Sequence, residues 1–173
     1  DGLLAKVIPE LGENYTVSHG TRYCVPYDPS TQLMFYRRDL FTDPTYKRMY
    51  FEAYRKELKV PESFGEYNRI AGFFTRSRNP ASPIQYGSAV AGGNVVTSPS
   101  EFMPRLFEAG GDLLDSCGRV TIFTPPAPLA LKNYPETYFF SDRIVHAVWE
   151  NVLGGFADGA AAMTGGVINY ASH

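Results

Sequence analysis

Three segments of the sequence place polar side chains or glycines at points where strands are expected to end. They are Tyr27-Asp28-Pro29-Ser30-Thr31-Gln32, Gly92-Gly93-Asn94, and the tail from Gly165-Gly166 to Asn169-Tyr170. Carboxylate and amide groups can form paired hydrogen bonds with sugar hydroxyls, and a tyrosine ring can lie against a sugar ring. Because ligands of open α/β sheets bind beyond strand ends, these segments are the candidate binding site; the alternative is that they are ordinary turns.

Side-chain patterns typical of enzymes are scarce in this chain. It contains no phosphate-binding loop, dinucleotide fingerprint or Gly-x-Ser-x-Gly elbow, and its three histidines lack partners at metal-ligand spacing. Among the carboxylates, Asp39 and Glu101 are expected to cap turns or helices, which leaves Asp28 as the least explained. A carbohydrate-active enzyme that uses Asp28 with another carboxylate is therefore the alternative to a binding protein without catalytic activity, cofactor or metal.

Composition sets further bounds. The 173 residues favour one domain, and a hydrophobic content of 44% is enough for a core. The 16 basic and 18 acidic residues give a net charge of -2, which argues against a nucleic-acid-binding protein because no excess of positive charge is present. No apolar run approaches the roughly 18 residues of a membrane span. Cys24 and Cys117 could pair in an oxidising compartment, but two buried thiols are the preferred interpretation.

The spacing of apolar residues predicts alternating strands and helices. Strands are expected over 22–27, 32–37, 86–91, 120–123 and 160–163, and helices over 43–58, 63–75, 102–110 and 141–153. Asp43 and Ser63 are expected N-caps, and a short helical stretch is expected before Tyr134. Pro104 would break a helix that began at Pro99, so that helix is expected to begin near residue 102. Such alternation is typical of an α/β domain in which helices pack on a mixed sheet.

The segment from Gly155 to Gly166 predicts a turn from a helix into a strand. Gly159 permits a tight reversal that a Cβ would obstruct. The small residues that follow it can enter a crowded strand, and Gly165-Gly166 leave bare backbone that a ligand can approach. The tail is therefore expected to carry Asn169 and Tyr170 to the binding site.

Five phrases occur in an order that resembles one protein family. They are Pro26-Tyr27-Asp28 with Phe35-Tyr36-Arg37-Arg38-Asp39-Leu40-Phe41, Val60-Pro61-Glu62-Ser63-Phe64-Gly65-Glu66-Tyr67, Tyr86-Gly87, Phe107-Glu108-Ala109-Gly110-Gly111-Asp112, and Phe156-Ala157-Asp158-Gly159-Ala160-Ala161-Ala162-Met163-Thr164. Together they make residues 23–170 similar to extracellular solute-binding proteins of sugar ABC transporters, of the maltose-binding-protein type. The resemblance implies a periplasmic-binding-protein-like α/β lobe, with helices flanking a mixed sheet. It also implies a periplasmic or extracellular protein, in some members anchored by a lipid, that delivers a carbohydrate to a membrane permease.

The resemblance further implies that the chain is a fragment, because members of the family have two lobes and are about twice as long. Residues 1–31 are then the end of the first lobe with the hinge, and residues 32–173 are a truncated second, C-terminal lobe. The expected partners are a carbohydrate or polyol ligand, the permease and the missing first lobe. An exposed half-cleft and an exposed hinge strand also favour self-association of the fragment.

Matching positions carry the family's cleft onto this sequence. The hinge segment, with Tyr27, Asp28, Thr31 and Gln32, is expected to border the cleft. The loop Gly92-Gly93-Asn94, with Thr97 and Ser98 behind it, falls where the second lobe supplies polar contacts. Asn169 and Tyr170 follow the last strand, where relatives present an aromatic ring to the sugar.

Overall fold

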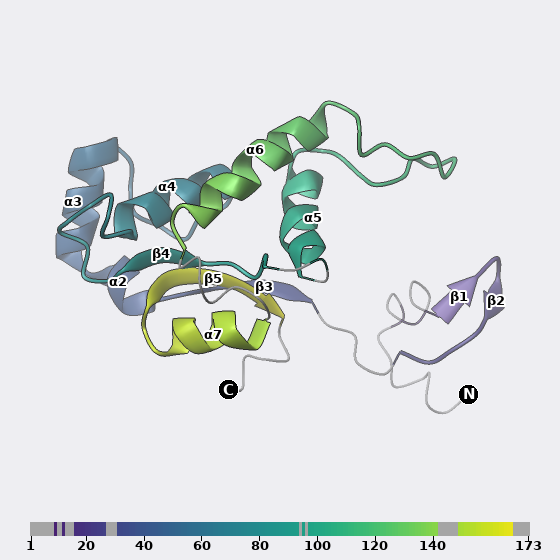
Figure 1. The fold of residues 1–173 in the computed structure, drawn as a ribbon, viewed down its shortest axis with the longest axis horizontal. Helices are drawn as coiled ribbons and strands as arrows, with labels where there is room; N and C mark the ends of the chain where they lie inside the picture. The colour runs from purple at the N-terminus through teal and green to yellow at the C-terminus, as the bar shows by residue number, and fades with distance from the viewer. Residues whose placement is uncertain are drawn as a thin grey trace.

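The computed structural model describes Pro9, Gly12 and residues 16–26, 31–93, 95, 97–141 and 149–167. A small hairpin, β1 (Val17–Ser18) and β2 (Thr21–Arg22), precedes the main body. The main body contains β3 (Gln32–Tyr36), α2 (Arg38–Thr42), α3 (Pro44–Tyr54), α4 (Phe64–Phe74), β4 (Tyr86–Ala89), α5 (Ser98–Glu108), α6 (Pro126–Tyr138), α7 (Trp149–Ala157) and β5 (Ala161–Val167). Figure 1 shows that the hairpin and the loop between α5 and α6 both project away from this body.

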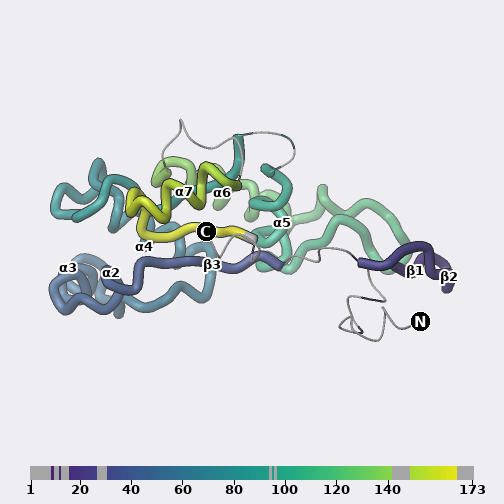
Figure 2. Tube along the Cα trace, turned by 90° about the horizontal axis from the view of Figure 1, so that it is seen from below, coloured from purple at the N-terminus to yellow at the C-terminus, as the bar shows by residue number. Residues whose placement is uncertain are grey.

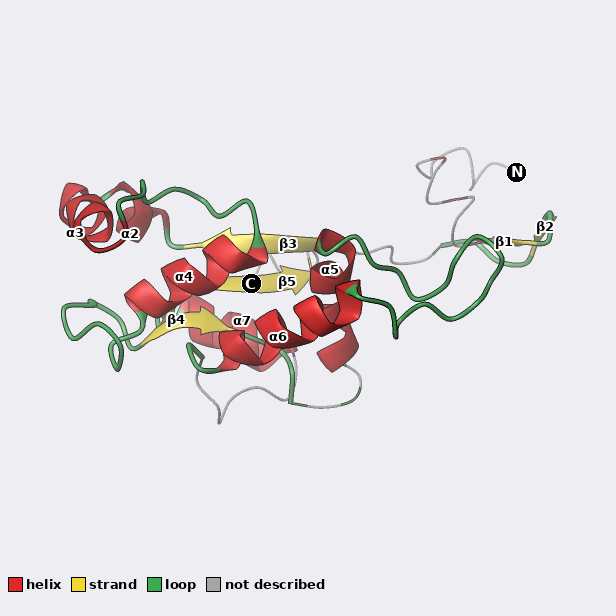
Figure 3. Ribbon diagram, turned by 90° about the horizontal axis from the view of Figure 1, so that it is seen from above, coloured by secondary structure: helices red, strands yellow, loops and turns green. Residues whose placement is uncertain are grey.

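The sheet of the main body is mixed and has the order β3-β5-β4. β5 runs antiparallel to β3, with Gln32 opposite Val167, and parallel to β4, with Ala89 opposite Thr164. α7 covers one face of this sheet, while α4, α5 and α6 lie over the other (Figures 1 and 3). The predicted α/β architecture, with helices flanking a mixed sheet, is therefore confirmed.

The main core lies between α4 and the sheet. Its buried apolar residues come mainly from α2, α3, α4 and β5, and they include Phe41, Tyr50, Ile70, Phe74 and Met163. Figure 2 shows that α2 and α3 sit together at one end of this body, beside α4. Fully burying a large apolar side chain contributes about 1.5–3 kcal/mol, so this aromatic-rich cluster is the principal source of stability.

One glycine lets α4 lie directly on β4. Gly87 is buried in β4, and a Cβ built there would overlap the backbone carbonyl of Ala71 in α4. Since backbone cannot move aside as a flexible side chain can, this packing requires glycine at position 87. The hydroxyl of Thr75, at the end of α4, also accepts a hydrogen bond from the Gly87 N–H at 3.0 Å.

Two predicted helix starts are confirmed. The Asp43 carboxylate accepts a hydrogen bond from the Thr45 N–H at 2.6 Å, and the Ser63 hydroxyl accepts one from the Glu66 N–H at 3.2 Å. Glu66 Oε2 in turn accepts from the Glu62 N–H at 3.0 Å, and this bond lowers the pKa of Glu66. These caps satisfy N–H groups that have no partner inside their own helices.

Other expectations about the elements are corrected. α5 begins at Ser98 and continues through Pro104, and the Ser100 carbonyl, which lacks a donor at Pro104, accepts a hydrogen bond from Gln32 Nε2 instead. The expected strand over 120–123 is reduced to a single bridge, Leu114 to Val120, and the strand expected over 22–27 ends at Arg22. α7 runs through Gly154 and Gly155 to Ala157.

The turn after α7 has the predicted form. Gly159 has φ +81°, a conformation that other residues rarely adopt, and its carbonyl accepts a hydrogen bond from Arg37 Nη1 at 3.4 Å. The same guanidinium is held by Asp39 at 2.8 Å and 2.6 Å, which lowers the pKa of Asp39. Asp39 is therefore engaged in positioning Arg37 beside the turn into β5.

The interpretation of the cysteines as buried thiols is wrong. Cys24 and Cys117 are both exposed, and no disulfide joins them within the described part of the chain. Cys117 lies in the loop between α5 and α6, where Asp115 Oδ1 accepts hydrogen bonds from the Cys117 and Arg119 N–H groups. A tight polar turn of this kind offers no apolar surroundings in which to bury a thiol.

Candidate functional site

The sheet brings the described parts of the predicted site segments to one edge. β4 and β5 are parallel, so their C-terminal ends meet there, and antiparallel β3 begins at the same edge. Thr31, Gln32, Gly92 and Gly93 all follow or precede strands at this edge, and Thr31, Gln32 and Gly93 are exposed. The remaining predicted site residues, namely Tyr27, Asp28, Asn94, Asn169 and Tyr170, lie outside the described residues.

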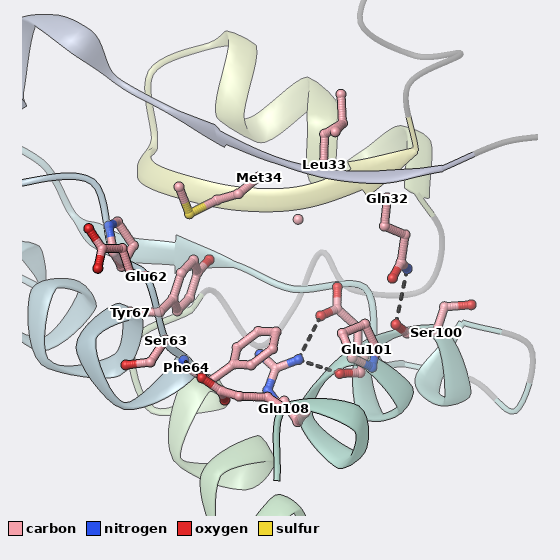
Figure 4. A pocket seen from close by; sticks show the side chains of 14 residues that line it. Gln32, Leu33, Met34, Glu62, Ser63, Phe64, Tyr67, Ser100, Glu101 and Glu108 are labelled. Atoms are coloured by element: carbon pink, nitrogen blue, oxygen red, sulfur yellow. Dashed lines mark hydrogen bonds and ion pairs between the residues drawn. The ribbon is translucent and has the colours of Figure 1, made fainter. Parts of the chain in front are cut away.

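A pocket of about 330 Å³ lies between β3 and the helices α4 and α5 (Figure 4). Its lining is largely apolar, with polar groups at the rim, which is typical of small-molecule sites. The lining residues are Gln32, Leu33, Met34, Pro61, Glu62, Ser63, Phe64, Tyr67, Ser100, Glu101, Pro104, Arg105, Glu108 and Gly165. Of the predicted site residues that the structure describes, only Gln32 lines it. The other lining residues come from β3, β5, α4, α5 and the segment before α4, and the apolar faces of the two helices gave no sign of a pocket.

Gln32 spans the mouth of the pocket from β3 to α5. Its Nε2 donates a hydrogen bond to the backbone carbonyl of Ser100 at 3.0 Å (Figure 4). Gly165 lies on the neighbouring strand, and a Cβ built there would come no closer than 4.0 Å to Glu101 Oε1. Bare backbone of β5 therefore faces the pocket at Gly165, with room for a small group beside it. Gly166, the other glycine of the predicted pair, is buried against Leu153 and Phe35 instead.

A buried ion pair stands behind the pocket. Arg105 Nη1 lies 3.2 Å from Glu101 Oε2, and the two side chains are only 2% and 9% exposed. The Arg105 guanidinium is stacked 4.2 Å from the ring centroid of Phe64 and 5.3 Å from that of Tyr134, and its Nη2 donates to Thr137 at 3.2 Å. This one side chain thus ties α5 to α4 and α6.

Glu101 does not cap its own helix, contrary to the prediction. Its Oε1 accepts a hydrogen bond from the Ala91 N–H at 3.1 Å, just beyond β4. Burial raises the pKa of Glu101, and the charge of Arg105 together with the Ala91 N–H opposes that rise. The carboxylate therefore fixes the chain between β4 and the loop that begins at Gly92.

Gly92 has a packing role of its own. A Cβ at this position would overlap the hydroxyl of Tyr138 and come within 2.6 Å of that of Tyr134. Those two hydroxyls lie 3.0 Å apart, and burial together with this bond raises the pKa of Tyr138. The carbonyl of Gly92 accepts a hydrogen bond from the Ser98 hydroxyl at 2.9 Å, so the start of α5 also holds this loop.

Other chemistries receive no support from the described residues. No group of three or more His, Cys, Asp or Glu side chains among them could hold a metal ion. In the same part of the chain, no helix is both long enough and apolar enough to cross a membrane. The carboxylates at the rim of the pocket are already engaged: Glu62 pairs with Lys59 at 2.6 Å, and Glu108 accepts from the Phe64 N–H at 2.9 Å.

Comparisons with known proteins give a fold but no sequence family. No model of a protein family and no curated protein matches the sequence. Among solved structures, a solute-binding protein of an ABC transporter from Agrobacterium radiobacter K84, in complex with ribitol, is similar over 95% of this chain with 22% identity and a TM-score of 0.72. Maltose-bound MalE3 of T. maritima gives 24% identity and a TM-score of 0.70, again over 95% of this chain. A solute-binding protein from Thermotoga lettingae TMO, bound with alpha-D-tagatose, gives 23% and 0.67 over 94%.

The chain therefore has the fold of part of an ABC transporter solute-binding protein. It spans only 38% of the ribitol-bound protein and 39% of each of the other two. The matched proteins are binding proteins rather than enzymes, which agrees at this coarse level with the scarcity of catalytic patterns in the sequence.

Proposed function

We propose that this chain is the carbohydrate- or polyol-binding part of a solute-binding protein that serves an ABC importer. The observation that carries the proposal is the match of nearly the whole chain to three binding proteins whose structures hold ribitol, maltose and tagatose. These ligands share a chain or ring of hydroxyl groups. In the proposal the ligand is held between two lobes in the periplasm or outside the cell, and the membrane permease receives it.

The sheet edge supports this proposal with suitable chemistry. Gln32 offers an amide, Gly93 and Gly165 offer open backbone, and Met34 offers apolar surface for the carbon side of a sugar (Figure 4). Polyhydroxy ligands need such a mixture, because each ring or chain has polar hydroxyls and apolar C–H groups. In the proposal Tyr27, Asp28, Thr31, Asn94, Asn169 and Tyr170 complete the site along the same edge. Residues 1–31 then lead from the first lobe through the hinge, and residues 32–173 form the second lobe.

Ligand-dependent thermal stabilisation tests the proposal. The chain is heated with ribitol, D-mannitol, D-tagatose or maltose, since a ligand that binds only the folded state stabilises it by an amount that grows with the logarithm of ligand concentration above Kd. We expect at least one of these ligands to raise the melting temperature progressively as its concentration is increased. No shift with any of them, together with no heat of binding in calorimetry, would refute the proposed function.

Gly165→Ala supplies a matched variant for the same experiment. A methyl group at this position meets no atom within ordinary contact distance except Glu101 Oε1 at 4.0 Å, so the fold should tolerate it. The methyl nevertheless projects into the pocket and should weaken binding of any ligand that approaches the β5 backbone. An unchanged melting temperature without ligand and a reduced shift with ligand are the expected results.

A further inference from the structure

The side-chain amide of Gln32 is held in one of its two possible orientations. Nε2 donates to the Ser100 carbonyl at 3.0 Å, and turning the amide over would place Oε1 against that oxygen. Two acceptors cannot form a hydrogen bond, so the bond to Ser100 selects one orientation of the amide. Oε1 is then left as an acceptor at the mouth of the pocket that Gln32 lines (Figure 4).

Pro104 explains why the Ser100 carbonyl is available. In an α-helix, a carbonyl accepts from the N–H four residues later, and for Ser100 that residue is Pro104, which has no N–H. The carbonyl can therefore accept from a donor outside the helix, and Gln32 supplies it from β3. The proline that the sequence analysis expected to break α5 instead leaves α5 intact and frees an acceptor beside the pocket.

We propose that Gln32 is a specificity-determining residue that presents a fixed acceptor to a hydroxyl group of the ligand. This inference rests on the proposed function. Ser100 and Pro104 act as positioning residues, because they orient the amide before any ligand arrives. Such preorganisation removes the cost of ordering the side chain when the ligand binds. The site is therefore expected to select a ligand group that donates a hydrogen bond over a group of the same size that can only accept.

The charges around Gln32 agree with this selectivity. Glu62 and Glu108 are exposed carboxylates at the rim, and Arg105 is the single cation among the fourteen lining residues. Its guanidinium is engaged by Glu101 and stacked between two aromatic rings. Acceptors thus predominate at the mouth of the pocket, and although Lys59 pairs with Glu62, a ligand carboxylate or phosphate would meet the negative charge of Glu108.

Hydroxyl-to-fluorine replacement in the ligand tests the selectivity directly. The ligand that binds most tightly is taken from ribitol, D-mannitol, D-tagatose and maltose. It is compared with analogues in which one hydroxyl at a time is replaced by fluorine, which can accept a hydrogen bond but cannot donate one. One replacement should weaken binding to the wild-type chain by about threefold to tenfold, the range for one hydrogen bond. Gln32→Ala should weaken binding of the parent ligand by a similar factor and should no longer distinguish that analogue from the parent. Gln85→Ala, an exposed glutamine away from the pocket, is the matched control and should behave as wild type.

Pro104→Ala tests the positioning. Alanine supplies an N–H that competes for the Ser100 carbonyl, so the Gln32 side-chain NH₂ signals in NMR should move toward those of a solvated amide. Affinity should fall about twofold to tenfold as the amide loses its fixed orientation. Pro99→Ala removes the other proline of α5 without affecting Ser100, since Pro99 lies in the first helical turn, and should change neither readout.

The outcomes separate the two proposals. If the wild-type chain binds none of the four ligands, the proposed function fails and this inference falls with it. If the wild-type chain binds but Gln32→Ala binds equally well with the same ranking of analogues, only the inference is overturned. Unchanged Gln32 NH₂ signals in Pro104→Ala would likewise overturn the positioning role.

Discussion

Separate removal of Arg105 and Glu101 tests how far the fold around the pocket depends on their buried ion pair. The side chains are 2% and 9% exposed, so each substitution leaves the partner's charge buried with fewer compensating groups. Breaking such a pair costs about 3–5 kcal/mol of unfolding free energy. For a domain of this size that corresponds to a fall in melting temperature of roughly 6–20 °C.

The two single variants should differ in their response to pH. In Glu101→Gln the arginine stays charged at every accessible pH, although Thr137 and the two aromatic rings still contact it. In Arg105→Met the buried Glu101 can take up a proton, since burial already raises its pKa and the opposing positive charge is gone. When the pKa of a carboxyl is raised in the folded state, its protonation stabilises that state. This stabilisation is fully present below the unfolded-state pKa of about 4.3 and is lost as the pH rises through the folded-state pKa. Arg105→Met should therefore be less destabilised in mildly acidic buffer than at neutral pH, whereas Glu101→Gln should not recover.

Urea unfolding of the single variants and of the double variant Glu101→Gln/Arg105→Met is the assay. The double variant buries no unpaired charge and should recover at least about 1 kcal/mol relative to the worse single variant. Arg48→Met is the control, because Arg48 and Glu52 form an exposed pair at the same helical spacing and should contribute less than about 1 kcal/mol. Single variants as stable as Arg48→Met, or a double variant no better than the worse single one, would refute the reasoning.

Two further stability predictions and one on association follow from the fold. Gly87→Ala should lower the free energy of unfolding by about 3 kcal/mol or more in denaturant unfolding, since its Cβ would overlap the α4 backbone. Gly65→Ala is the control: its Cβ would have its nearest contact at 3.9 Å, so this variant should be as stable as wild type or more stable. Ser63→Ala should cost about 0.5–2 kcal/mol through the lost cap, and Ser63→Thr should retain most of it; equal losses in both would contradict the cap. Leu33 is 42% exposed on the edge strand β3, so Leu33→Lys should reduce any self-association seen by sedimentation; unchanged association would place the contact elsewhere.

Local signals in the sequence predicted the elements well wherever a short-range rule decides the outcome. Asp43, Ser63 and Gly159 occupy the predicted cap and turn positions, because their roles depend only on neighbouring backbone. The prediction for Pro104 was wrong because its effect depends on a donor from β3, Gln32, which lies 68 positions away in sequence from Ser100. Intrinsic helix propensity does not take account of a hydrogen bond that a distant strand supplies to the helix.

The candidate site was only partly predictable for the same reason. Strand-end reasoning selected Gln32 and Gly92 as residues where strands begin or end, and the strand register brings these strand ends to one edge of the sheet. The same reasoning missed Arg105 and Glu101. Their spacing of four residues is equally typical of an exposed ion pair on a solvated helix face and of a buried ion pair. The same helix carries Leu106, an apolar residue that indicates a buried side. Deciding whether Glu101 and Arg105 lie on that side requires knowing which elements cover it.

Chemical-shift mapping by NMR tests the central claim most directly. The isotopically labelled chain is titrated with ribitol, D-mannitol, D-tagatose and maltose into the millimolar range, and the backbone and glutamine side-chain amides are followed. We expect saturable shifts for at least one ligand, concentrated at Gln32, Gly93 and Gly165. An absence of shifts with all four ligands, or shifts confined to the projecting loop around Cys117, would contradict it.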